Sequence, residues 1–166
     1  MKRRRLLITG VMTTLAMGLI AAHTFLNNDY AKIRLATAEF HSTEAAKEAG
    51  YDLRPGLDNC FDNPGVGGMG FHYIDAAALD TKLDLFHPEA MVYAPGPNGQ
   101  LQLGAVEYIV PQDQWDATGS KEPPVLMGMH LHLNKDLHVY VMHAWVWKDN
   151  PRGIMEDWNP NVSCPK

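Results

Sequence analysis

The sequence is poor in residues that several common chemistries require. It contains three serines and no Gly-x-Ser-x-Gly motif, which disfavours serine-type nucleophilic catalysis. A glycine-rich stretch over residues 56–70 lacks the Lys-Ser/Thr pair of a phosphate-binding P-loop. The chain has two cysteines, and neither lies near the end of the N-terminal apolar run, so a lipoprotein anchor is not indicated. Internal repeats and low-complexity segments are also absent.

Basic residues are scarce beyond the first 22 positions. The whole chain carries 14 Lys and Arg against 19 Asp and Glu, which gives a net charge of −5. Four of the basic residues and none of the acidic ones lie before residue 23, so the remainder has 10 against 19 and a net charge of −9. Such a chain offers no electrostatic footprint for nucleic acid or for an anionic membrane. Metal cations are the more natural partners.

The first 22 residues have the pattern of an export signal. Residues 2–5 are basic, residues 6–22 form an uncharged apolar run, and polar residues follow. This order is typical of a secretory signal peptide, here with cleavage after Ala22. The alternative is an uncleaved anchor, although the run is shorter than the ~20 residues that span a bilayer. We expect a periplasmic or extracellular protein in which residues 1–22 are the signal peptide or anchor and residues 23–166 form a single domain.

Cys60 and Cys164 are predicted to form a disulfide. An even number of cysteines in an exported chain favours pairing, and the alternative is two free thiols. The bond would close a loop of about 100 residues and fasten the C-terminal tail to the start of the main sheet.

Apolar periodicity predicts an α+β fold. Residues 29–50 have a roughly helical pattern that ends at Gly50. A strong turn signal at residues 95–99 predicts a hairpin, and the alternation slips at Gly104, which predicts a bulge. We expect an N-terminal helical segment packed on a curved, barrel-like antiparallel β-sheet with one disulfide. The predicted strands outside the histidine-rich segment are residues 69–75, 90–94 and 100–110.

The segment from residue 125 to 147 holds four of the eight histidines and is predicted to be the central hairpin. Its two runs both alternate and meet at a turn over residues 134–136. His130 and His132 are two apart on the first predicted strand, so both should point to one face. His143 lies on the second predicted strand. The hairpin alone would then supply three imidazoles to one metal ion.

Two residues from other strands complete the predicted metal site. His72 lies on the strand at residues 69–75, on the face opposite Phe71 and Tyr73. Glu107 is a lone acid in an apolar run, and a carboxylate there is costly to bury unless it is paired or bound to a metal. Glu89 is a second candidate, but its place at a strand start predicts exposure. The predicted ligands are therefore His72, Glu107, His132 and His143, with His130 in reserve.

This ligand set suits a divalent transition metal, namely Zn, Fe, Mn or Cu. An open coordination position would make the protein a metalloenzyme acting on a small organic molecule. One alternative is a non-enzymatic protein that binds copper, with Met127 and Met129, or a small apolar ligand in a pocket formed by Trp145, Trp147 and Tyr108. Another is a structural module with hydrogen-bonded histidines and no site.

The chain contains the motifs Met69-Gly70-Phe71-His72-Tyr73, Pro88-Glu89, Val106-Glu107-Tyr108, His143-Ala144-Trp145-Val146-Trp147, Asn150-Pro151, Asp157-Trp158-Asn159-Pro160 and Cys164. Together these motifs resemble those of a group of small exported bacterial proteins of uncharacterised function. The resemblance covers most of the chain beyond the export signal, and it implies a bacterial, extracytoplasmic setting without adding a chemistry. The His-x-His pair also resembles that of the cupins, which place metal ligands in a small β-barrel. A cupin has a Glu a few residues after the pair, whereas the next acid here is Asp136 in the turn, so this likeness is one of architecture.

Overall fold

A computed structural model describes residues 29–165, so the predicted signal peptide or anchor at residues 1–22 lies outside the described residues. Within this part of the chain, no helix is long and apolar enough to cross a membrane. The α+β class is confirmed. Residues 29–37 are helical, and the elements that follow are η1 (Ala38–His41), α2 (Thr43–Glu48), β1 (Tyr51–Asp52), β2 (Phe61–Asn63), β3 (Gly67–Asp75), β4 (Ala90–Pro95), β5 (Leu101–Pro111), α3 (Gln112–Ala117), β6 (Val125–Leu126), β7 (Met129–His130), β8 (His132–Asn134) and β9 (Val139–Ala144).

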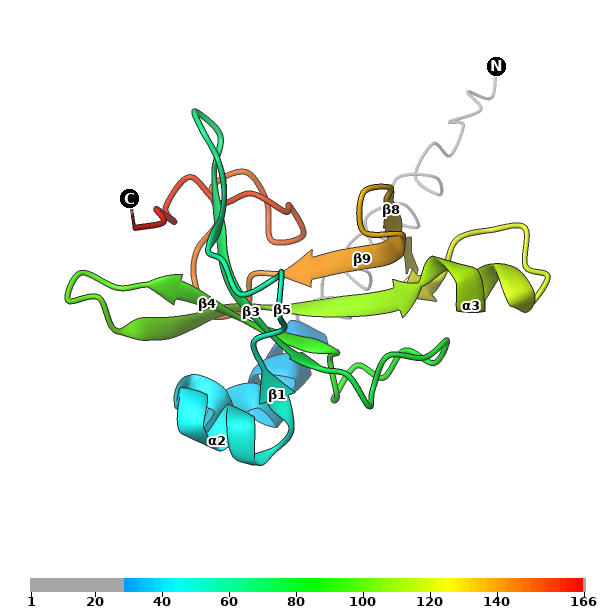
Figure 1. Ribbon diagram of the computed structural model, residues 1–166, viewed down its shortest axis with the longest axis horizontal. Helices are drawn as coiled ribbons and strands as arrows, with labels where there is room; N and C mark the ends of the chain where they lie inside the picture. Colours follow the sequence, from blue (N-terminus) through cyan, green and yellow to red (C-terminus); the bar gives the residue numbers. More distant parts are fainter. Residues whose placement is uncertain (1–28, 166) are drawn as a thin grey trace, which may run out of the picture.

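Seven strands form one antiparallel sheet (Figure 1). Its order is β1-β3-β4-β5-β9-β8, and β2 also pairs with β3. The short strands β6 and β7 form a separate hairpin. The main sheet is not closed, because β1 and β8 do not pair with each other. The predicted antiparallel sheet is confirmed, and its closure into a barrel is not.

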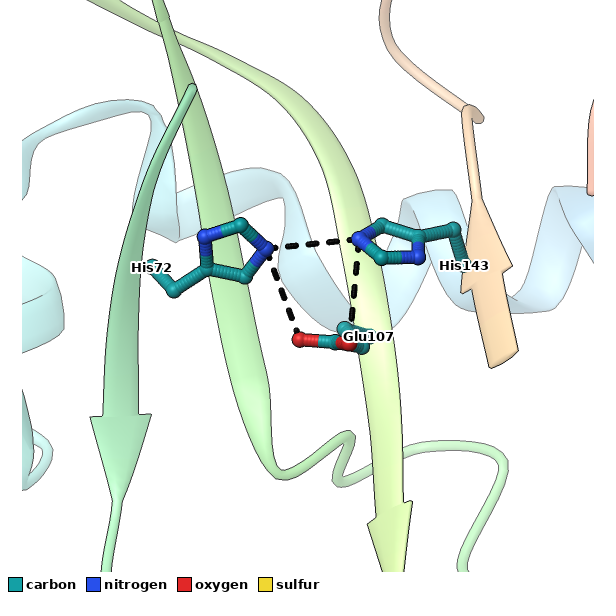
Figure 2. Close-up of side chains that lie close together, drawn as sticks. All are labelled: His72, Glu107 and His143. Carbon is teal, nitrogen blue, oxygen red and sulfur yellow. Dashed lines mark hydrogen bonds and ion pairs between the residues drawn. The ribbon is translucent and has the colours of Figure 1, made fainter. Parts of the chain in front are cut away.

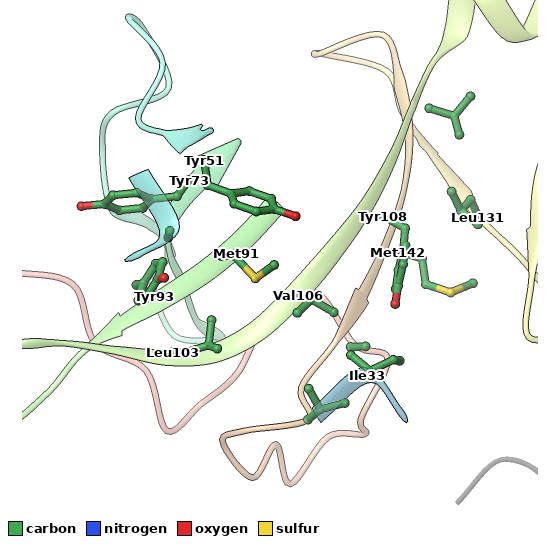
Figure 3. Packing of buried hydrophobic residues seen from close by; sticks show 14 residues of the cluster. Ile33, Tyr51, Tyr73, Met91, Tyr93, Leu103, Val106, Tyr108, Leu131 and Met142 are labelled. Atoms are coloured by element: carbon green, nitrogen blue, oxygen red, sulfur yellow. The ribbon is translucent and has the colours of Figure 1, made fainter. Parts of the chain in front are cut away.

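The two faces of the sheet have different cover. The N-terminal helices lie against one face and bury the main core there (Figures 1 and 3). Alternate residues of β4 and β5 supply this core, among them Tyr93, Val106 and Tyr108, and Ile33 and Ala46 meet them from the helices. Period-two alternation sends the neighbouring residues of the same strands to the opposite face. That face carries the candidate site.

The C-terminal coil covers part of the opposite face. Val162 packs into a second core cluster with Trp145 and Val92. An isolated bridge joins Gly68 to Asn159, and the predicted disulfide between Cys60 and Cys164 is present. The coil is thus fastened to the sheet by backbone hydrogen bonds, by apolar packing and by a covalent bond.

A bulge in β5 sets which residues face the site. Val92 pairs with Ala105 and Tyr93 pairs with Leu103, so Gly104 is the extra residue. This confirms the predicted bulge. The bulge restores the alternation so that Tyr108 enters the main core while Glu107 points to the opposite face.

The first strand predicted for the central hairpin is not a single strand, because the segment is divided into β6, β7 and β8. Met127 and Gly128 both have positive φ, 52° and 74°, and form a tight turn that folds β6 back on β7. The main-sheet hairpin is β8 with β9, and its turn covers residues 135–138 rather than 134–136. His130 and His132 therefore belong to different strands in different sheets.

Candidate metal centre

Three buried side chains converge on the face opposite the helices. His72 comes from β3, Glu107 from β5 and His143 from β9, and Figure 2 shows the three groups pointing toward one another. The two Nε2 atoms are 3.3 Å apart. One carboxylate oxygen of Glu107 lies 3.5 Å from Nε2 of His72, and the other lies 3.7 Å from Nε2 of His143. We call these three residues the triad.

Strand register explains how residues so distant in sequence meet. Glu107 is the direct cross-strand partner of His143 on one side and of Ala90 on the other. His72 lies one strand beyond β4, opposite Val92. Because Ala90 and Val92 carry short side chains, the imidazole of His72 can reach across β4 to Glu107. The meeting point depends on the whole central sheet rather than on any one local motif.

A second carboxylate orients the triad from the C-terminal coil. Oδ1 of Asp157 lies 3.1 Å from Nδ1 of His143, and Oδ2 lies 3.0 Å from Nε2 of His132. Trp145 Nε1 and the Asn150 amide donate to the backbone carbonyl of Glu156, and Asn150 also donates to that of Trp158. The backbone on both sides of Asp157 is therefore fixed. An ionised carboxylate can only accept, so Nδ1 of His143 carries the proton and Nε2 turns its lone pair toward the triad.

Burial disfavours charge on two members of the triad. Burial, reinforced by the charge of His143, lowers the pKa of His72 to about 3, so this imidazole is neutral at ordinary pH. Its Nδ1 has no hydrogen-bond partner of normal geometry among the described residues. Burial also raises the pKa of Glu107, an effect that His143 opposes only in part. Because His72 is neutral, it gives the Glu107 carboxylate no ion pair.

For three further groups, neighbouring charges and hydrogen bonds outweigh the effect of burial on the pKa. Burial alone would lower the pKa of His143, but the carboxylates of Glu107 and Asp157 outweigh it and raise that pKa. Burial would raise the pKa of Asp157, but the hydrogen bonds from His132 and His143 hold it well below its usual range. The hydrogen bond to Asp157 raises the pKa of His132 against the effect of its partial burial. The cluster thus combines two carboxylates with the imidazoles of His72 and His143, whose Nε2 atoms could both bind one cation.

Comparisons of this chain with models of protein families, with curated proteins and with solved structures give no match. The resemblance to small exported bacterial proteins therefore stays a prediction. What the site can do follows from its own donor atoms and their spacing.

The triad has the geometry of three ligands on one side of a metal ion. A tetrahedral Zn²⁺ with ligand distances of about 2.0–2.1 Å holds neighbouring ligand atoms ~3.3–3.4 Å apart. An octahedral ion with ligands near 2.1 Å holds them ~3.0 Å apart. The 3.3 Å between the two Nε2 atoms matches the tetrahedral value, and each of these atoms lies 3.5 or 3.7 Å from a different oxygen of Glu107. A divalent cation would also balance the two carboxylates, Glu107 and Asp157.

The structure brings together three of the five predicted ligands. His132 reaches the same face but contacts Asp157 rather than the triad, and its side chain is 52% exposed. His130 is exposed on β7, where its nearest polar partner is the carbonyl of Pro123, so it lies apart from the triad. Met127 and Met129 pack against the main core on the helix side, so the methionine-containing copper site does not assemble.

The predicted ligand pocket of Trp145, Trp147 and Tyr108 is found only in part, because Trp145 and Trp147 line one pocket and Tyr108 is not among the residues that line it. Strand β9 ends at Ala144, so the alternation that would have placed the two tryptophans on one face stops before them. Trp145 packs in the second core cluster, whereas Trp147 packs against the main core and donates its Nε1 hydrogen to Thr37. Tyr108 is fully buried, and its hydroxyl donates to the carbonyl of Leu85.

Two acidic residues behave differently from the sequence expectation. Glu89 was predicted to be exposed, but it is buried with 2% exposure. Its side chain turns inward and accepts a hydrogen bond from the backbone N–H of Ile109. Asp157 was not among the predicted site residues. It lies in a coil without periodicity, and its sequence signals are its place in the Asp157-Trp158-Asn159-Pro160 motif and its position seven residues before a disulfide cysteine. The coil's attachment to the sheet is what carries it to the site.

Proposed function

We propose that the protein binds one divalent transition-metal ion through His72, Glu107 and His143 and is a metalloenzyme that acts on a small organic molecule. The observation that carries this proposal is the convergence of three buried side chains from three strands, whose nearest ligand atoms lie 3.3–3.7 Å apart in pairs. Buried histidines and carboxylates that serve only structure are usually satisfied in pairs. Three that share one centre favour a common ligand.

The number of protein ligands favours a catalytic site over a structural one. Structural zinc sites use four protein ligands, whereas catalytic sites use three and leave a position for water or substrate. The two-His, one-Glu set occurs in zinc hydrolases, and a two-His, one-carboxylate set also occurs in non-haem iron oxygenases. A divalent ion in such a site acts as a Lewis acid on a bound oxygen group. The nearly tetrahedral spacing makes Zn²⁺ our first choice, and hydrolysis the reaction class we expect.

Asp157 supports the proposal from outside the triad. Metal-binding histidines commonly donate their second ring N–H to a carboxylate, which fixes the tautomer and strengthens the ligand. Nδ1 of His143 makes this bond to Asp157. The disulfide is in turn consistent with an exported, non-cytoplasmic protein.

Metal content tests the proposal. The full chain is exported to an oxidising compartment, purified without a histidine tag and assayed by elemental analysis, and the metal-free protein is titrated with Zn²⁺ against a chromophoric chelator. We expect one metal per chain. His143→Ala removes a ligand, and Glu107→Gln removes the anionic ligand at nearly unchanged volume, so both variants should lose at least 100-fold in affinity.

His130→Ala is the matched control, because it removes a histidine from the same stretch that does not reach the triad. It should retain the metal with wild-type affinity. Circular dichroism establishes that each variant is folded. Folded wild-type protein that takes up no metal, or a folded Glu107→Gln variant that binds as tightly as wild type, would refute the proposal. Hydrolysis of neutral nitrophenyl esters, lost on chelation and in Glu107→Gln, would establish the reaction class.

A further inference from the structure

The triad lines a pocket whose walls are mostly apolar. The pocket has a volume of about 390 Å³. Ten of its sixteen lining residues are apolar, and they come from the sheet, from the loops beside it and from the C-terminal coil. The ring of Phe61 stands edge-on to that of His72 at a centroid distance of 5.3 Å. The apolar wall residues include Leu57, Phe61, Leu79, Ile109, Val139 and Trp158.

The charges of the pocket exclude a strongly anionic ligand. No Lys or Arg is among its lining residues within the described chain, and its acidic members are Glu107, Asp136 and Asp157. Anion sites in proteins are built from Arg, Lys or clustered backbone N–H groups. An organic cation has no free carboxylate to pair with either. Asp157 contacts two imidazoles, and Glu107 faces the two histidines of the triad. Asp136 is exposed in the turn at residues 135–138, where water screens its charge.

The volume sets the size of the occupant. A dry cavity of about 150 Å³ holds benzene. A pocket of about 390 Å³ has room for two fused rings with a short polar substituent. Ligand pockets of this kind obtain most of their affinity from apolar contact, and a few polar groups fix the orientation. Here the fully buried polar groups that line the pocket are those of the triad, and Asn134, Asp136 and Asp157 line its more exposed part.

We propose that this pocket takes an uncharged, mainly apolar organic molecule of about two-ring size, with one hydroxyl or carbonyl group directed at His72, Glu107 and His143. The proposal rests on the proposed function in that the polar group meets the metal, and it adds the substrate class. The apolar walls supply the affinity, so binding of the apolar body does not itself require the ion.

Three probes of equal ring size and different charge test the assignment. They are 2-naphthalenemethanol, 2-naphthalenesulfonate and 2-naphthylmethylammonium, titrated calorimetrically into the Zn²⁺-loaded full chain. We expect the neutral alcohol to bind at least 10-fold more tightly than either ion. In the metal-free protein its affinity should fall by less than 10-fold. Tighter binding of either ion, or no binding of any probe, would overturn the proposal.

A pair of Val→Trp variants locates the binding. Val139→Trp adds a large side chain at a position that lines the pocket, four residues before His143, and should weaken the neutral probe at least 10-fold. Val125→Trp is the control, because Val125 is 51% exposed on β6 and lies outside the pocket. Equal binding by the two variants would overturn the assignment to this pocket.

Metal titration of the same samples separates this proposal from the proposed function. Stoichiometric metal uptake without probe binding would refute the substrate class and leave the metal site standing. Probe binding that Val139→Trp abolishes, in a protein that takes up no metal, would refute the proposed function and leave the apolar pocket assigned.

Discussion

Asp157 links a buried imidazole to an exposed one and so acts on the triad from outside it. His143 is 1% exposed, whereas the side chain of His132 is half-exposed, and the two oxygens of Asp157 contact one ring each. The carboxylate fixes a proton on Nδ1 of His143, so Nε2 is the ring atom that faces Glu107, and the same contact raises the pKa of the ring. Its contribution should therefore appear as metal affinity rather than as metal stoichiometry.

Asp157→Asn should weaken metal binding by about 10–100-fold while one site per chain remains. The amide has nearly the same volume, but it carries no charge to strengthen His143 as a ligand. Competition with a chelator measures the affinity. Asp136→Asn is the control, because Asp136 lines the pocket without contacting either imidazole. An Asp157→Asn variant with unchanged affinity would contradict the orienting role.

Glu89 carries a pH dependence of stability that is separate from the site. Burial raises the pKa of Glu89 to about 7, although the N–H of Ile109 opposes part of that shift. The carboxyl group of an unfolded chain titrates near pH ~4.3. Between these two values the folded state binds more protons than the unfolded state, so stability falls as the pH rises. The stabilisation that the raised pKa of Glu89 gives the folded state is complete below about pH 4 and is lost above about pH 7.

We expect Glu89→Gln to remove this part of the pH dependence. Gln is neutral at every pH and keeps an oxygen that can accept from Ile109. The variant should match wild type near pH 4.5 and exceed its free energy of unfolding by ~3 kcal/mol at pH 8. Urea unfolding at both pH values measures the difference. Glu122→Gln, at an exposed position, should change neither value, and a Glu89→Gln variant less stable than wild type at pH 8 would contradict the sign.

At the scale of the strands, a single glycine permits β3 and β4 to approach each other. Gly70 has a φ of 106°, and a Cβ there would overlap the backbone carbonyl of Tyr93 on β4. Gly99, in the β4–β5 turn, has a φ of 74° and nothing within 4 Å of its Cβ position. Both glycines have a positive φ, but only Gly70 lies against the backbone of a neighbouring strand. Gly70 also lies two residues before His72, on the strand that delivers that ligand.

Gly70→Ala should therefore destabilise the protein by at least ~2 kcal/mol more than Gly99→Ala. Both substitutions place a side chain at positive φ, which costs about 1–2 kcal/mol, and the overlap adds to this at Gly70 alone. Chemical denaturation measures the two free energies of unfolding. Equal losses would mean that β3 shifts away from β4 freely, and metal affinity in Gly70→Ala would then report whether His72 moves with it.

The strands that the sequence predicts well are those with uninterrupted alternation. Residues 69–75 and 90–94 alternate cleanly, and β3 and β4 cover them. The slip at Gly104 marks the bulge because one extra residue inverts the phase of a period-two pattern. The stretch at residues 125–133 keeps its alternation while the backbone turns at Met127-Gly128, so the pattern does not reveal the turn. A non-glycine residue at positive φ leaves little trace in the periodicity.

The site residues that lie on regular strands could be predicted from the alternation of the sequence. His72, Glu107 and His143 each lie on a regular strand whose face can be read from the pattern. Asp157 cannot be found that way, because a coil has no period and its position depends on Trp145, Asn150 and the disulfide. The prediction for His130 fails because of a turn that the alternation does not reveal. That turn places His130 in a separate hairpin, away from the face that its spacing from His132 predicted.

The whole molecule couples its C-terminal tail to the centre of the sheet. The disulfide joins residues 104 apart in sequence, and the coil before it passes the triad at Asp157. Two other attachments hold that coil, namely the bridge between Gly68 and Asn159 and the burial of Val162, which is 3% exposed. Loss of the covalent bond should therefore loosen the coil without releasing it.

The double variant Cys60→Ser/Cys164→Ser should lose about 2–5 kcal/mol of stability, because a loop of this length restricts the unfolded chain strongly. Its metal affinity should fall by less than in Asp157→Asn, since Asn159 and Val162 still hold the coil near His143. Urea unfolding and chelator competition measure the two quantities on the same samples. If the affinity falls as far as in Asp157→Asn, the disulfide is what positions the carboxylate. If it does not fall while stability does, the backbone bridge and Val162 suffice, and the disulfide serves the fold alone.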